Sequence, residues 1–275
     1  MNNYVFFVEG NQDVAMLYRV LTDFLGFTEI KSYKKIENNI IFAKKVKTKF
    51  PFKKNSLNIF NEIPMFFEKG DKQICVINAN GEANLLYKLD TFYDIQDNNE
   101  FESIEKFIIF ADGDLKTKDE KIEELKTYIQ PKEKNRKLKY IKENSFKNDC
   151  LEFNVHGVDV QANLFIFPNN NDKGRLENIL IENLKNNYSC LHKETILHFE
   201  NLEKNCNIQW ADTNSDRNKA LVGCIGNIII PSASNVTLIS NKDFQWIDKE
   251  NISKDLKILI DFLKGMLGES DETNI

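Results

Sequence analysis

The segment KFIIFADGDLK, residues 106–116, constrains the fold more than any other part of the chain. Five apolar residues, Phe107 to Ala111, form a run that is too short for a helix and rich in β-branched and aromatic types. Such a run predicts a buried β-strand, and it ends abruptly at Asp112-Gly113-Asp114. In open α/β sheets, ligands bind beyond the carboxyl ends of the strands, so acids at that edge are well placed for chemistry.

Asp112 and Asp114 are two residues apart, a spacing that places both side chains on one side of an extended chain. We therefore expect the two carboxylates to face the same point. At about 4 Å and an effective dielectric constant near 20 they would repel each other by roughly 4 kcal/mol. A bound divalent cation would relieve that repulsion. The alternative is a tight turn, because Asp-Gly is also a strong turn signal.

A second strand end carries an acid near the N-terminus. YVFFV, residues 4–8, predicts a buried strand that ends at Glu9-Gly10, and the apolar spacing after it predicts a helix from Asn11 to Leu25. Asn11 is the expected N-cap and Gly26 the expected stop. Asp13 lies in the first turn, where the helix dipole alone would explain an acid. Glu9 ends the predicted strand, where no comparable structural effect explains an acid.

The rest of the chain alternates between expected strands and helices. Further strands are expected at 73–81 and 162–168, with a hairpin at 151–160. Helices are expected at 82–93, 175–186 and 192–204, a charged surface helix at 118–129, and apolar-faced segments at 215–230 and 254–267. This alternation predicts an α/β fold with a mostly parallel sheet and helices on both faces. We expect one domain over 1–275, with a lysine-rich insertion at about 30–70 and a C-terminal helical extension at about 231–275.

Composition describes an ordinary water-soluble globular protein. The chain of 275 residues is 41% hydrophobic and 29% charged, and no apolar run approaches transmembrane length. The N-terminus lacks a basic region typical of a signal peptide, and the five cysteines form no CxxC pair. We therefore expect a cytoplasmic protein with reduced thiols and no membrane partner.

Lysines are concentrated in the segment that follows the first predicted helix. The formal net charge is −5, which argues against a protein that coats nucleic acid generally, but a local lysine cluster could track a phosphate backbone. The alternative is a solvated face in a composition rich in Lys, Asn and Ile. The candidate nucleic-acid-binding residues are Lys44, Lys45, Lys47, Lys49, Lys53 and Lys54.

Several common catalytic motifs are absent. The sequence has no GxGxxG after its first strand, no GxxxxGK[ST] and no GxSxG, and its three histidines lack metal or triad spacing. Acids at the ends of predicted elements remain. Magnesium prefers oxygen ligands and commonly links one or two carboxylates to phosphate, and two such ions can hydrolyse a phosphodiester.

Two short segments resemble a known family. VEGNQDVAML at 8–17 and FADGD at 110–114 look like the Toprim fold of primases, topoisomerases and the overcoming-lysogenization-defect (OLD) nucleases. In that fold a Glu ends the first strand and a DxD ends a later one. FIFPNNNDKGRLENIL at 165–180 resembles a group of small Toprim-like bacterial proteins related to the OLD branch.

The resemblance implies roles for six residues. Glu9 would be a metal ligand or general acid/base, Asp112 and Asp114 would hold metal, and Asp13 with Glu177 would complete a second site. Lys219, in SDRNKAL at 215–221, would stabilise developing phosphate charge. Two alternatives remain open: Glu177 borders an apolar helix face, and an Asp/Lys-rich helix start is common. The implied cofactors are two Mg²⁺ or Mn²⁺ ions.

The chain also departs from the family pattern. Lys116 stands where the third acid of the DxDxD of topoisomerases and primases would be, and the chain contains no ATPase module, so any nucleotide-driven step would need a separate ATPase partner. The expected function is a metal-dependent nuclease of DNA or RNA, in phage defence or nucleic-acid processing. A non-catalytic nucleic-acid-binding or regulatory module is the alternative, and a phosphatase acting on small substrates is a third possibility.

Overall fold

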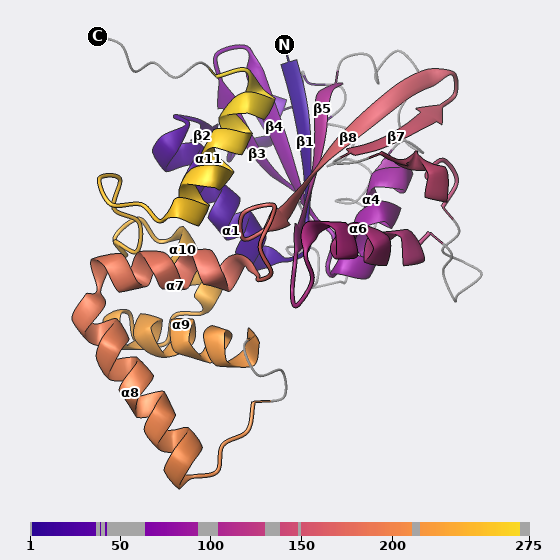
Figure 1. Cartoon of the computed structure of the whole chain (residues 1–275). Coiled ribbons are helices and arrows are strands. Elements are labelled where there is room, and N and C mark those ends of the chain that lie inside the picture. The colour runs from indigo at the N-terminus through magenta and orange to yellow at the C-terminus, as the bar shows by residue number, and fades with distance from the viewer. Residues whose placement is uncertain are drawn as a thin grey trace, which may run out of the picture.

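A mixed β-sheet runs through the middle of the molecule (Figure 1). The computed structural model describes residues 2–36, 39, 42, 64–92, 104–129, 138–147, 150–210 and 215–269. Within these residues the sheet has eight strands in the order β2-β3-β4-β1-β5-β8-β7-β6. The strands are β1 (Asn2–Val8), β2 (Thr28–Glu29), β3 (Met65–Lys69), β4 (Lys72–Asn78), β5 (Ile104–Asp112), β6 (Phe146–Lys147), β7 (Cys150–Val155) and β8 (Val158–Phe167).

Only the centre of the sheet is parallel. β1 pairs in parallel with β4 and β5, and β5 pairs in parallel with β8. The flanking strands pair antiparallel, through hairpins such as β3–β4 and β7–β8. The α/β class is confirmed, but the expectation of a mostly parallel sheet is wrong. Two-residue hairpin connections at Gly70-Asp71 and His156-Gly157 return the chain beside itself, and such short connections allow only antiparallel pairing.

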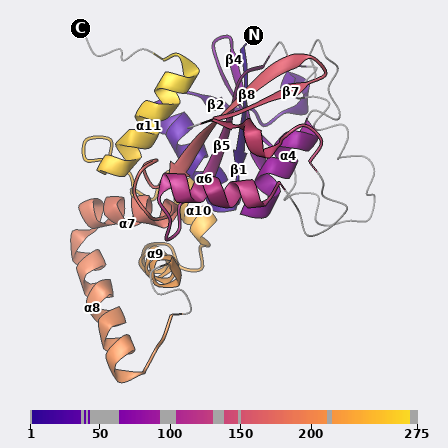
Figure 2. The same cartoon turned by 45° about the vertical axis from the view of Figure 1, so that its right-hand side comes forward.

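Helices cover both faces of the sheet. They are α1 (Asn11–Arg19), continued by a π-helical turn (Val20–Phe24), α2 (Tyr33–Ile36), α4 (Leu85–Phe92), α6 (Lys118–Thr127), α7 (Leu176–Asn187), α8 (Ser189–Asn205), α9 (Ser215–Ile229), α10 (Asn235–Ser240) and α11 (Lys254–Leu267), with short 3₁₀ turns at Glu82–Asn84 and Glu143–Ser145. In two views α4 and α6 lie on the other side of the sheet from α11, and α8 extends away from the sheet (Figures 1 and 2). No helix among the described residues is long and apolar enough to cross a bilayer.

Alternation along the central strands divides the core into two layers. On β1, Phe6 and Val8 pack with α1, α7, α9, α10 and α11, whereas Val5 and Phe7 pack with α4 and α6 on the opposite face. Successive strand side chains point to opposite faces, so an uninterrupted apolar strand fills both layers. The segment predicted as a C-terminal extension supplies part of the first layer: the ring of Phe262 on α11 lies 4.9 Å from the ring of Phe165 on β8.

The start of α1 differs from the prediction in a way that affects the site. Gly10, not Asn11, is the N-cap residue, and its backbone N–H donates to the Asp13 carboxylate at 2.8 Å. The Asn11 side chain instead pairs with Asn78 of β4. Gly26 has a φ of 71°, in the left-handed region, and confirms the predicted helix stop. The cap therefore brings Asp13 back toward the end of β1.

Close packing of α9 on α10 depends on a glycine. A Cβ placed at Gly226 would lie 1.9 Å from Cδ1 of Leu238, which is buried. We expect Gly226→Ala to destabilise the protein by about 1–3 kcal/mol, as overpacking does in well-packed cores. Gly265→Ala on α11 is the matched control: a Cβ there would meet nothing within 4 Å, so it should stabilise by up to about 1 kcal/mol through helix propensity. Urea unfolding measures both, and equal stabilities for the two variants would contradict this packing.

Candidate metal centre

Four acidic side chains from separate parts of the chain lie around the carboxyl edge of the parallel strands, near enough to act on one another electrostatically. No three of them bring carboxylate oxygens within 4.8 Å of one another. Glu9 follows β1, Asp112 ends β5, Asp13 lies in the first turn of α1 and Glu177 lies in the first turn of α7, which follows β8. β1, β5 and β8 are neighbours in the sheet and run in the same direction, so their ends open onto one place. The fold therefore brings together residues that the sequence separates widely.

Hydrogen bonds fix Glu9 and Asp112 against each other. The backbone N–H of Asp112 donates to Oε1 of Glu9 at 2.7 Å, and Oδ1 of Asp112 accepts from the backbone N–H of Leu176 at 3.0 Å. These bonds join the ends of β1 and β5 to the first turn of α7. Both acids keep one carboxylate oxygen beyond these bonds, and both are only partly buried, so an ion could reach them from solvent.

Asp13 and Glu177 form the inner part of the cluster. Their exposed fractions are 6% and 3%. Burial raises the pKa of Asp13 well above its ordinary value, and the charges of Asp112, Glu9 and Glu177 raise it further. Burial also raises the pKa of Glu177, against the lowering effect of Lys219 and Arg175. The pKa shift of Asp13 shows that these four acids act on one another electrostatically.

The pKa values of Glu9 and Asp112, the two more exposed acids of the cluster, are raised for the same reasons. Burial and the charge of Asp112 raise the pKa of Glu9 to about 8. Burial and the charge of Glu177 raise the pKa of Asp112 to about 7. Among the described residues, none of the four acids forms an ion pair within 4.0 Å. The cluster is therefore a concentration of negative charge that either protons or a cation must neutralise.

These shifts predict a pH dependence of stability. Glu9 and Asp112 bind protons more tightly in the folded state than in the unfolded state, so the folded state holds more protons between about pH 4 and about pH 8. The free energy of unfolding should therefore fall as pH rises through this window, by several kcal/mol at about 1.4 kcal/mol per pKa unit. Added Mg²⁺ should reverse the loss at high pH. Thermal unfolding across this range, with Mg²⁺ or EDTA, measures both effects; metal-free stability that rises toward about pH 8 would contradict them.

Lys219, on α9, is exposed but lies near enough to Glu177 to lower the pKa of that acid. α9 packs beside α7 in the same core layer, which explains how a residue so far along the chain approaches the cluster. Of the four acids, Lys219 affects the pKa of Glu177. The six predicted lysines, Lys44, Lys45, Lys47, Lys49, Lys53 and Lys54, lie outside the described residues.

Asp114 does not face the same point as Asp112. The strand ends at Asp112, and Asp114 has a φ of 57°, so the alternation of an extended chain does not apply to it. The backbone N–H of Lys116 donates to the carbonyl of Gly113 at 2.9 Å, which is the tight turn that Asp-Gly also predicted. The carboxylate of Asp114 points to two cationic side chains, Arg175 and Lys121.

A second carboxylate cluster lies beside the first. Oxygens of Glu82, Asp114 and Glu124 all lie within 4.8 Å of one another, a spacing that could hold a metal ion. The ammonium of Lys121 is already there, at 2.7 Å from Glu82, 3.0 Å from Asp114 and 2.9 Å from Glu124. Burial opposes the charged form of Lys121, but hydrogen bonds to Glu82, Glu124 and Asp114 outweigh it and raise the pKa.

The sequence pattern had not indicated this cluster. Residues 118–129 predict a charged surface helix, yet Lys121 is completely buried. Glu124 stands three residues after Lys121, a spacing typical of a surface helix pair, so the pattern by itself predicts only a solvated face. Glu82 opens the 3₁₀ turn four residues after β4, and this position shortly after a strand is the one signal of the cluster that the sequence contains.

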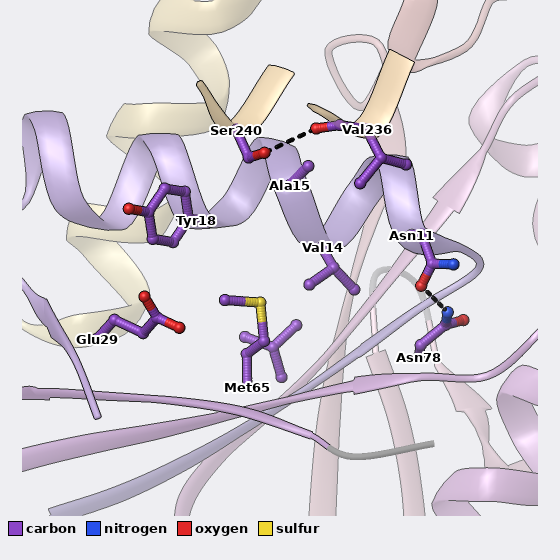
Figure 3. Close-up of a pocket in the computed structure, with 10 residues that line it drawn as sticks. Asn11, Val14, Ala15, Tyr18, Glu29, Met65, Asn78, Val236 and Ser240 are labelled. Atoms are coloured by element: carbon purple, nitrogen blue, oxygen red, sulfur yellow. Dashed lines mark hydrogen bonds between the residues drawn. The ribbon is translucent and has the colours of Figure 1, made fainter. Parts of the chain in front are cut away.

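A pocket of about 510 Å³ lies on the other side of α1 (Figure 3). Val14 and Tyr18 of α1, Met65 of β3 and Val236 of α10 line it, and Asn11 bonds Asn78 at one end. The α1 residues on this pocket recur at helical spacing, whereas Asp13 lies on the opposite face of the helix. The lining includes Glu29 but neither lysine nor arginine, so the pocket is suited to an uncharged or donor-rich group and not to phosphate.

Fold and site together define a class: a three-layer α/β protein with a buried carboxylate centre at the carboxyl edge of its parallel strands. The chain belongs to the family described as "Protein of unknown function (DUF3226)", whose model matches residues 3–264. None of the curated proteins matches it. The crystal structure of the hypothetical protein PH0156 from Pyrococcus horikoshii OT3 is similar, with a TM-score of 0.50, 15% identity, and coverage of 97% of this chain and 96% of that chain. At this identity the similarity concerns the fold alone.

Proposed function

We propose that this protein is a Mg²⁺- or Mn²⁺-dependent phosphodiesterase of the Toprim type that cuts DNA or RNA. The observation that carries the proposal is that Glu9, Asp13, Asp112 and Glu177 lie around one sheet edge and raise one another's pKa values, without an ion-pair partner among the described residues. Structural acids are normally paired or solvated, whereas partly or fully buried acids that raise one another's pKa values are typical of functional sites.

The donor set suits a hard divalent cation. All four side chains offer oxygen, which Mg²⁺ and Mn²⁺ prefer, and burial together with mutual repulsion raises the pKa values of Glu9 and Asp112, which a bound cation would reverse. Glu9 and Asp112 would hold one ion, and Asp13 and Glu177 would contribute to a second. Two bound ions would activate a water and stabilise the leaving oxygen of a phosphodiester. This donor set, not the DxD spacing, supports the metal assignment.

Two side chains would then serve the reaction itself. Lys219 is an exposed cation within electrostatic range of Glu177, where it could stabilise the negative charge that develops on a phosphate. Glu9 would serve either as a metal ligand or as a general acid or base, and its pKa of about 8 without a bound ion suits the second role. The Toprim resemblance suggests these same roles, and the position of Lys219 near Glu177 supports the first.

The partner we propose is a nucleic acid, gripped by Lys44, Lys45, Lys47, Lys49, Lys53 and Lys54. A separate ATPase could drive any nucleotide-dependent step, in the cytoplasm, in phage defence or nucleic-acid processing. These roles rest on resemblance and on composition.

One observation favours a second candidate function, a non-catalytic nucleic-acid-binding or regulatory module. Asp114 would be a metal ligand in a complete Toprim site, yet Arg175 and Lys121 hold its carboxylate. A scaffold that had lost one ligand could still bind nucleic acid. Its binding would weaken steeply with salt and would be indifferent to EDTA.

A cleavage assay tests the proposal. Supercoiled DNA, linear DNA, single-stranded DNA and RNA are incubated with the protein in Mg²⁺, in Mn²⁺ and in EDTA. We expect at least one polymer to be cut with a divalent ion and none in EDTA. Binding that EDTA leaves unchanged, with no cutting, would support the module instead, and release of phosphate from mononucleotides without cutting of polymers would support the phosphatase.

A further inference from the structure

We infer that Asp114 is a positioning residue and not a metal ligand. The side chains of Lys121 and Arg175 bind its carboxylate in the place of a metal ion, and this contact connects the loop after β5 to the loop before α7. The inference rests on the proposed function, because the loops in question carry Asp112 and Glu177. It departs from the role that the DxD resemblance implies for Asp114.

Both carboxylate oxygens of Asp114 are occupied. Oδ2 lies 3.0 Å from Nζ of Lys121, and Oδ1 contacts Nε of Arg175. Lys121 is completely buried and cannot swing into solvent to release the oxygen. A metal ion would therefore have to displace two charged partners, one of them enclosed by protein.

The backbone reinforces the same connection. The N–H of Asp114 donates to the carbonyl of Gly174 at 2.7 Å, and the N–H of Gly113 donates to the carbonyl of Phe167 at 3.0 Å. Asp114 has a φ of 57°, a conformation that Asp and Asn tolerate better than most residues. A Cβ at Gly113 would lie 2.8 Å from the carbonyl oxygen of Phe167, so the two loops touch through backbone atoms. Asp114 thus lies where backbone hydrogen bonds and close packing hold the two loops together.

The contact sets the geometry of the proposed metal centre. Asp112 lies two residues before Asp114 and accepts a hydrogen bond from Leu176, which is next to Arg175 and to Glu177. Because Asp114 holds Arg175 and Gly174 at the same time, it fixes the first turn of α7 relative to the end of β5. Asp112 and Glu177 therefore keep a constant separation, as positioned ligands require.

The two carboxylate clusters differ in how far nearby cationic side chains balance their charge. Glu82, Asp114 and Glu124 meet three cationic side chains, since Lys121 contacts all three, Arg175 contacts Asp114 and Lys116 contacts Glu124. Glu9, Asp13, Asp112 and Glu177 have no ion pair within 4.0 Å among the described residues. A divalent ion would add excess positive charge to the first cluster, whereas the four ionised carboxylates of the second could accept two divalent ions before their charge is balanced.

The test compares Asp114→Asn with Asp112→Asn by Mn²⁺ binding, measured from the electron paramagnetic resonance signal of free Mn²⁺. Asn keeps the shape of Asp and tolerates the left-handed backbone, so we expect both variants to fold. Asp114→Asn should bind as many Mn²⁺ ions as the wild type, with affinity within about 10-fold, whereas Asp112→Asn should lose an ion or at least about 100-fold in affinity. Equal losses in the two variants would overturn the inference.

A second measurement does not depend on metal. In a double-mutant cycle, Asp114→Asn and Arg175→Gln each remove one side of the same contact, so the double variant should unfold at nearly the temperature of the worse single variant. Additive losses would overturn the inference. If the wild type binds no Mn²⁺ at all, the proposed function fails, and the cycle still decides whether Asp114 holds the two loops together. In an active enzyme, both single variants should lower kcat by about 10- to 100-fold and leave KM nearly unchanged.

Discussion

Asp112→Asn is expected to lower metal-dependent cleavage by at least about 10²- to 10³-fold, because it removes a carboxylate that would hold an ion against the substrate phosphate. Asn keeps the side-chain oxygen that accepts from the backbone N–H of Leu176, so the first turn of α7 should stay in place. The measurement is the rate of cutting of the preferred polymer at saturating Mg²⁺. Unfolding by urea in the same buffer shows whether the variant is folded.

The same substitution should stabilise the metal-free protein at alkaline pH. Burial and the charge of Glu177 raise the pKa of Asp112 to about 7. At about pH 8 the ionised carboxylate therefore lowers the free energy of unfolding, and an uncharged amide does not. Asp119→Asn is the control, because Asp119 is an exposed carboxylate in the first turn of α6. It should change neither rate nor stability by much. Full activity in Asp112→Asn would show that Asp112 is not part of the catalytic site.

Lys121→Met is expected to cost about 3–5 kcal/mol of stability near neutral pH, the usual loss when one partner of a buried ion pair is removed. Methionine fills a similar volume, so the loss would come from charge. Oxygens of Glu82, Asp114 and Glu124 would remain within 4.8 Å of one another with no ammonium between them. Burial raises the pKa of Glu82, so protonation of Glu82 should recover part of the loss at about pH 5. Urea unfolding at the two pH values measures both parts.

Lys126→Met on the same helix is the matched control for that variant. Lys126 pairs with Glu123, whose side chain is 69% exposed, and such surface pairs contribute at most about 1 kcal/mol. A loss in Lys121→Met no larger than in this control would show that the buried ammonium is not what holds the three acids. A loss that grows at low pH would contradict the electrostatic explanation as well.

Uninterrupted apolar runs made the central strands predictable. Phe107 to Ala111 and YVFFV could be buried on both faces only in the middle of a sheet, and β5 and β1 lie there. LEFNVHGVDV at 151–160 predicts a hairpin, which the antiparallel pair β7 and β8 confirms. The other flanking strands were harder to predict, because the pairing of a strand depends on contacts that its own pattern does not contain. Helix α11 was predicted well because its apolar spacing is regular.

The acids at strand ends were predictable from position, and their partners were not. Glu9 and Asp112 follow apolar runs, so the sheet edge could be inferred from each run alone. The two cations that hold Asp114 come from α6 and from the loop before α7, and no local pattern connects them. Lys121 was predicted to lie on the surface, because helical spacing indicates only the neighbours on the same helix. It does not indicate the other parts of the chain that bury this residue.

Calorimetric titration of the metal-free protein with Mg²⁺ at about pH 8 tests the central claim most directly, since there the deprotonated carboxylates need a cation. The account predicts saturable binding that weakens as pH falls toward about pH 5, because protons and Mg²⁺ compete for Glu9 and Asp112. It also predicts that Asp112→Asn loses an ion or at least about 100-fold in affinity, and that Asp119→Asn binds as the wild type does. No saturable binding at about pH 8, or binding that Asp112→Asn leaves unchanged, would show that this carboxylate cluster is not a metal centre.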